Sequence, residues 1–224
     1  MADYASTGGK EYGFPRAPKL AAKSPEETHM AAKKIGILGD GHVGSALARG
    51  WQRAGYEVKA VGNDQKAQKD TAAWGDVVVL AVPFGALDDV VKTLGNALDG
   101  KTVVDVTNAL GPNMKLAVGF TTSGAEELQK KAPRARVAKA FNTVFAQHMD
   151  KGHVGDRPLT TFVASDDPKA KAETLELAKA IGFDAVDAGP LESARLLEPL
   201  ALLNIRLGYM LGMGTQIGFE LVHA

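Results

Sequence analysis

Cysteine is absent from the 224 residues of the sequence. This absence excludes disulfides, thiolate zinc sites, iron–sulfur clusters and a cysteine nucleophile. An excess of charge of either sign is also lacking, because 26 Lys and Arg residues balance 26 Asp and Glu residues. Such a chain has no long-range field to attract nucleic acid or an anionic membrane. We therefore expect a small-molecule partner, no nucleic-acid partner and a cytoplasmic protein.

Long apolar runs are missing as well. No stretch reaches the roughly 18 uncharged apolar residues that a membrane-spanning helix needs, and the start lacks the apolar centre of a signal peptide. We therefore expect no membrane partner. Residues 1–32 carry Pro15, Pro18 and Pro25 without apolar periodicity, which predicts a flexible extension.

From residue 33 onward, short β-rich runs alternate with helical patterns. The alternation predicts a doubly wound, mainly parallel α/β sheet of the Rossmann type over residues 33–189. We expect strands at 33–38, 56–62, 76–83, 101–108, 135–141, 159–165 and 183–189. Residues 63–75 are too few for the usual helix, strand and further helix. The edge strand at that position should be missing.

The last part of the chain, residues 190–224, is apolar almost all round. We interpret it as a small C-terminal helical part that forms a cleft wall and a dimer contact, with Pro199 bending or breaking its first helix.

A glycine-rich turn follows the first predicted strand. Gly39, Gly41 and Gly44 fit the pattern G-x-G-x-x-G between a strand and a helix. In this context the glycines allow a tight turn, close approach of a diphosphate and close packing of helix on strand. The motif predicts a bound dinucleotide.

Asp40 places a carboxylate between the first two glycines. Backbone amides do the binding in such loops, so we expect this side chain to point sideways, away from the phosphates. His42 offers partial charge compensation when protonated, but both side chains could equally just line the mouth of the loop.

The end of the second predicted strand carries Asn63 and Asp64, about 20 residues past the third glycine. An acid here accepts hydrogen bonds from the adenosine ribose and repels a 2′-phosphate, which favours NAD. Lys66 and Lys69 follow closely, so NADP remains an alternative to NAD as the bound dinucleotide. A solvated charged turn is the alternative interpretation.

Six stretches carry a family resemblance: "KIGILGDGHVGSALA", "VVVLAVP", "VVDVTN", "VAKAFNTVFA", "DAGPLESARLLE" and the terminal "LLNIRLGYMLGMGTQIGF". Together they resemble the NADPH-dependent deazaflavin (coenzyme F420) reductases, which are related to the cytosolic domain of six-transmembrane metalloreductases. The resemblance implies a Rossmann domain with a small helical part, a homodimer, and hydride exchange between NADP and a deazaflavin or flavin.

The resemblance also implies the site residues. Asp40, Gly41, His42 and Val43 map onto the family's diphosphate loop. The nicotinamide side is implied to comprise Val82, Pro83, Thr107 and Asn108, and the floor where the two rings meet to comprise Phe141, Asn142 and Thr143. Asn63 and Asp64 replace the family's usual pair on the 2′-phosphate, and Asp40 replaces a small polar residue.

We expect Asn142 and Phe141 at the catalytic centre, with Asn142 orienting the carboxamide or the second ring; the alternative is that Asn142 caps a backbone turn. Lys139 and Asn108 are further candidates. His148 and His153 are interpreted as surface or loop histidines, so no metal is expected. The expected activity is an NAD(P)-dependent oxidoreductase. Two alternatives remain: a reductase of small imines or carbonyls, and a redox sensor without turnover.

Overall fold

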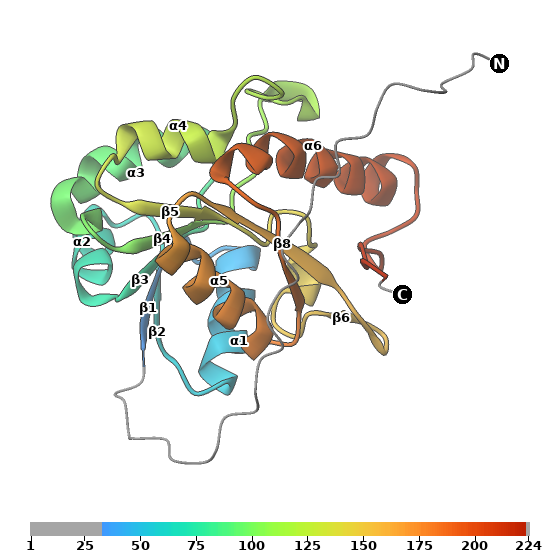
Figure 1. Cartoon of the computed structure of the whole chain (residues 1–224), viewed down its shortest axis with the longest axis horizontal. Helices are drawn as coiled ribbons and strands as arrows, with labels where there is room; N and C mark the ends of the chain where they lie inside the picture. The colour runs from blue at the N-terminus through green and yellow to red at the C-terminus, as the bar shows by residue number, and fades with distance from the viewer. Residues whose placement is uncertain (1–32, 223–224) are drawn as a thin grey trace, which may run out of the picture. The chain divides into compact units, whose positions relative to one another are not determined.

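The computed structural model describes residues 33–222, and these residues build one seven-stranded sheet (Figure 1). Its strand order is β2-β1-β3-β4-β5-β8-β9. The strands are β1 (Lys34–Leu38), β2 (Glu57–Val61), β3 (Val77–Leu80), β4 (Thr102–Asp105), β5 (Arg136–Lys139), β8 (Thr160–Ser165) and β9 (Asp184–Asp187). All neighbours are parallel except β5 and β8. A separate hairpin joins β6 (His153–Val154) and β7 (Arg157–Pro158).

Helices cover both faces of the sheet, because successive strand residues point to opposite sides. On β3, Val77 and Val79 join one core cluster, whereas Val78 and Leu80 join a second. The first cluster lies under α1 (His42–Arg53) and α5 (Pro168–Ala180). The second lies under α2 (Gln65–Trp74), α3 (Leu87–Leu94), α4 (Gly124–Lys131) and the start of α6 (Ala194–Ile205). The expected doubly wound α/β fold is confirmed.

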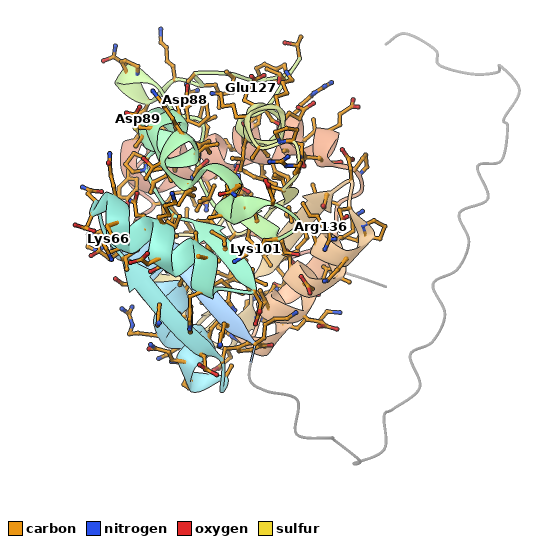
Figure 2. All side chains as sticks on the ribbon, turned by 90° about the vertical axis from the view of Figure 1, so that its left-hand side faces the viewer. Lys66, Asp88, Asp89, Lys101, Glu127 and Arg136 are labelled. Atoms are coloured by element: carbon orange, nitrogen blue, oxygen red, sulfur yellow. The ribbon has the colours of Figure 1, made fainter. Side chains whose placement is uncertain are left out.

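The sheet ends at β2 within the described residues, so the expectation of a missing edge strand is confirmed. The helix α2 leads directly from β2 to β3. Its last carbonyls are capped by the Lys101 ammonium, which donates to Ala73 at 2.8 Å and to Gly75 at 2.7 Å (Figure 2). Partial burial lowers the pKa of Lys101 below its ordinary value.

The C-terminal part is only partly helical. Helix α6 continues through Pro199 to Ile205, so the proline does not break it, and a wider turn spans Arg206–Met210. From Leu211 to Val222 no helix forms, which corrects the expectation of helices there. Instead the chain returns to β8, where the Thr160 amide donates to Phe219 at 2.8 Å. This backbone bond ties the C-terminal segment to β8 without adding a strand to the sheet.

Two further expectations depend on which residues the structure describes. The predicted flexible extension, residues 1–32, lies outside them. Within residues 33–222, every helix is too short or too polar to cross a membrane.

The close packing of α1 on β1 predicts that two glycines of the turn differ in how much a substitution lowers stability. A Cβ atom at Gly44 would collide with the carbonyl oxygen of Gly39, whereas one at Gly41 would meet nothing within 4 Å. We expect Gly44→Ala to lower the free energy of unfolding by about 2–3 kcal/mol, because α1 must move away from β1. Gly41→Ala should change it by only about 0.5 kcal/mol. Urea unfolding followed by tryptophan fluorescence measures both, and equal losses would contradict this packing.

Candidate functional site

The glycine turn brings the ends of β1, β2 and β3 close together. Gly39 adopts a φ of +111°, which favours glycine, and its amide donates to Val61 at 2.8 Å. A side chain at Gly39 would also collide with the carbonyl oxygen of Ala81. The turn is therefore fixed by backbone contacts with both neighbouring strands.

The N-terminus of α1 opens toward solvent at this turn. Gly41 is its N-cap and supplies no side-chain acceptor, and the first turn contains no acidic residue. Gly41 and His42 are exposed, Val43 is half-buried and Gly44 is buried. An uncapped helix N-terminus presents amides and a positive dipole end, which fit an anionic diphosphate.

The Asp40 carboxylate turns away from this helix end. Both of its oxygens lie 3.0 Å from the position that a Cβ atom would take on Gly62. The Asp40 carbonyl meanwhile accepts a 2.7 Å hydrogen bond from the Ser45 hydroxyl, which holds the loop. The side chain thus points sideways, to the end of β2, as the sequence led us to expect.

Asn63 and Asp64 follow β2 and are both exposed. Asp64 is the N-cap of α2, and its carboxylate accepts the Ala67 amide at 2.7 Å. This structural role explains an acid at the position. A contact between Asp64 and the ribose stays a prediction.

The remaining predicted residues follow three adjacent parallel strands and therefore meet at one edge of the sheet. Val82 and Pro83 follow β3, Thr107 and Asn108 follow β4, and Asn142 and Thr143 follow β5. Asn142 donates to the Asn108 side chain at 3.3 Å and to the Leu197 carbonyl at 2.9 Å. These bonds fix Asn142 between β4 and α6.

Phe141 follows β5 and carries a buried aromatic ring. Its backbone has a φ of +63°, and its ring is completely buried. The ring packs edge-on against Trp51 and Phe183, with centroid distances of 5.8 and 5.7 Å. The ring therefore belongs to the core between α1 and β9, and a role of Phe141 at the floor of the site stays a prediction.

A buried ion cluster lies directly beneath these residues. The Lys139 ammonium lies 3.0 Å from an Asp105 oxygen and 3.0 Å from a Glu198 oxygen, and it donates to the Thr107 carbonyl at 2.6 Å. Glu198 also accepts the Gly124 amide at 2.9 Å, at the N-terminus of α4. The cluster therefore joins β4, β5, α6 and α4.

The charge on Lys139 is maintained inside the protein. Burial, the largest single influence, opposes it, but attraction to Asp105 and Glu198 raises the pKa of Lys139 above its ordinary value. The stability that the charged Lys139 contributes is therefore fully present below the ordinary pKa of lysine. It is lost only as the pH rises through the raised pKa of Lys139.

Sequence reasoning named Lys139 but missed Asp105 and Glu198. One signal was available, since Asp105 and Lys139 each interrupt an apolar strand pattern and lie opposite one another in the β4–β5 register. A charge within a buried strand requires a partner. Nothing local indicated Glu198, which arrives from α6.

Thr107 carries a polar group without a partner. Among the residues that the structure describes, its Oγ1 is the buried side-chain polar atom that makes no hydrogen bond. Only 4% of Thr107 is exposed, and it lies at the end of β4 beside Asn108. A buried hydroxyl without a partner is costly, so this one fits a ligand that supplies the missing bond.

The two predicted loop histidines bind carbonyls. The His148 ring lies 2.8 Å from the Thr215 oxygen, and the His153 ring lies 2.6 Å from the Lys151 oxygen. His148 lies in the short turn Ala146–His148 and is buried, whereas His153 is half-buried. The His148 contact holds the C-terminal segment against the domain.

Comparison with known proteins shows which family the chain belongs to. The family model described as "NADP oxidoreductase coenzyme F420-dependent" matches residues 34–109. The F420-dependent NADP reductase of Methanocaldococcus jannaschii is 30% identical over 220 residues, covering 89% of this chain and 89% of that protein. The chain belongs to the F420-dependent NADP reductase family.

Two further similarities agree with this membership. A crystal structure from Arthrobacter sp. FB24, described as a candidate F420-dependent NADP reductase, has a TM-score of 0.78 and 29% identity, covering 85% of this chain and 99% of that one. Rat metalloreductase STEAP3 is 31% identical over 210 residues, but the chain spans only 42% of its length.

Membership in the F420-dependent NADP reductase family confirms two expectations. The resemblance and the Rossmann-like fold are both borne out. At the level of the family, the chain is an NAD(P)-dependent oxidoreductase.

The buried ion cluster predicts a large stability difference between two lysines. Lys139→Met leaves two buried carboxylates without their cation, so we expect a loss of about 3–5 kcal/mol in the free energy of unfolding. Lys131→Met removes an exposed partner of Asp88 and should leave stability nearly unchanged. Urea titrations at neutral pH measure both, and a mild Lys139 variant would contradict a fully formed cluster.

The unpartnered hydroxyl predicts an effect on affinity without an effect on stability. Thr107→Val keeps the shape of the side chain and removes no internal hydrogen bond, so unfolding should be unaffected. Dinucleotide affinity should fall about five- to tenfold, the value of one hydrogen bond. Calorimetric titration with NADP and NAD measures this.

Thr174→Val provides the matched control for the Thr107 variant. The buried Thr174 hydroxyl donates to Ala170 at 2.7 Å within α5. Its loss should lower stability by about 1 kcal/mol and leave affinity unchanged. The same pattern in both variants would contradict a ligand at Thr107.

Proposed function

We propose that this chain transfers a hydride between a nicotinamide dinucleotide, NADP or NAD, and a deazaflavin or flavin. The observation that carries the proposal is the set of polar groups beside the glycine turn. The uncapped N-terminus of α1 suits a diphosphate, and the free Thr107 hydroxyl lies at the strand ends. The names of the F420-dependent NADP reductases support the same pair of coenzymes.

The charged groups near the strand ends favour a reaction without acid or base catalysis. Lys139, Asp105 and Glu198 are completely buried and bonded to one another. Hydride transfer between two redox coenzymes needs little proton transfer from the protein, because the rings carry the chemistry. The protein then acts by binding the rings and placing their reacting carbons in contact.

Asn142 is proposed as the residue that orients the nicotinamide carboxamide. Its amide nitrogen is engaged with Asn108 and the Leu197 carbonyl. This arrangement leaves the side-chain oxygen to accept a hydrogen bond from the carboxamide. Because α6 fixes the side chain, its position is set before the coenzyme binds.

The C-terminal segment is proposed as a wall for the second ring and as the contact of a homodimer. Tyr209, Met210, Leu211 and Met213 are large apolar residues that are exposed in the single chain. Apolar side chains gathered on one segment favour contact with a flat ring or with another subunit.

The proposed reaction is tested with the purified full chain and reduced NADP or NAD, each labelled with deuterium at nicotinamide C4. We expect the C4–D bond to break and a C–D bond to form at deazaflavin C5, with the nicotinamide oxidised and the deazaflavin reduced. The label should appear in the deazaflavin by mass spectrometry, and deazaflavin absorbance should fall. Label released to solvent would contradict direct transfer.

A variant of the glycine turn, where the diphosphate is proposed to bind, serves as the control for this assay. Gly41→Val fills the open space at the α1 N-terminus and should raise KM for the dinucleotide.

Reduction of small imines or carbonyls in place of deazaflavin or flavin would favour the direct reductase. Binding of the dinucleotide without turnover of any acceptor would favour a redox sensor.

A further inference from the structure

We propose that Asp40 makes this chain select NAD over NADP, by placing its carboxylate where the adenosine ribose binds. The inference rests on the proposed function, since it assumes a dinucleotide at the glycine turn. It assigns the ribose contact to a residue of the turn itself, in place of the residues after β2.

The position of Asp40 is the first step of the argument. In dinucleotide-binding folds the ribose of the adenosine lies at the end of the second strand, where an acid accepts its hydroxyls. Here that end is Val61 and Gly62, and both Asp40 oxygens lie 3.0 Å from the Cβ position of Gly62. The missing side chain at Gly62 leaves the space that the carboxylate occupies.

The surroundings hold this arrangement in place. The Gly39 amide donates to Val61 at 2.8 Å, which ties the glycine turn to the end of β2. From the other side, the buried Gln68 side chain donates to the Gly62 carbonyl at 2.8 Å. The turn and the strand end therefore keep their spacing, and with it the place of Asp40.

Asp64, the acid expected from the sequence, has a different task. Its carboxylate caps α2 through the Ala67 amide at 2.7 Å. The cap engages one carboxylate oxygen and by itself accounts for an acid at this position. Asp64 still adds a second negative charge beside the strand end, which disfavours an anionic group there.

The nearby lysines have other main partners, although Lys66 is also attracted to Asp64. Lys66 binds Asp70 at 2.7 Å along the exposed side of α2 (Figure 2). Lys59, on β2, lies over the Trp74 ring at 4.2 Å. Lys69 belongs to the next turn of α2. NADP carries a 2′-phosphate of about −1.5 to −2 charge, which two carboxylates repel, whereas the 2′-hydroxyl of NAD can donate to Asp40.

Calorimetric titration of the full chain with NAD and NADP tests the proposal, with dissociation constants measured for wild type, Asp40→Asn and Asp64→Asn. Both substitutions remove one charge and keep the shape, and asparagine retains the α2 cap. We expect wild type to bind NAD more tightly. Asp40→Asn should shift the NADP/NAD affinity ratio toward NADP at least about tenfold, and Asp64→Asn by less than about threefold.

Three outcomes would overturn the proposal. They are a wild-type preference for NADP, an unchanged ratio in Asp40→Asn, and a larger shift in Asp64→Asn than in Asp40→Asn. The proposed function fails separately, because it requires binding of one dinucleotide and hydride transfer whichever is preferred. Equal binding of both dinucleotides with normal turnover would therefore remove only the role of Asp40.

Discussion

The buried contact between Lys139, Asp105 and Glu198 is the interaction on which the candidate site depends. Parallel strands place Lys139 opposite Asp105, and α6 brings Glu198 over the same edge of the sheet. Three charged groups can remain inside a protein only when each finds its partners. The cluster thus fixes the position of α6, and α6 in turn fixes Asn142 through the Leu197 carbonyl. Charge pairing in the core sets the geometry of polar groups at the surface of the site.

The two halves of the proposed site are built by different means. Around Gly41, backbone amides and open space provide the proposed diphosphate surface, and the proposed role of the Asp40 side chain is limited to the ribose. Around Thr107 and Asn142, side chains held by buried bonds provide the binding surface. The first half suits the invariant diphosphate of a dinucleotide, and the second half suits the ring that reacts.

Local patterns were sufficient to predict much of this fold. The glycine turn and the strand before it depend on neighbours in the sequence, and the structure contains both. The missing edge strand followed from the small number of residues, 63–75, between the second and third predicted strands. Contacts between distant segments were harder, because neither Glu198 nor the inward ring of Phe141 is marked by its neighbours. The direction of Asp40 was anticipated only as sideways, and its partner Gly62 required the fold.

The open edge at β2 has a consequence beyond nucleotide binding. Within the described residues no strand covers β2, so its outer amides and carbonyls are available to another extended chain. Glu57 and Lys59 project from this border and are exposed, and charged side chains at such a border discourage intermolecular pairing. At this border, charged side chains of one short strand take the protective place that a further strand would otherwise have filled.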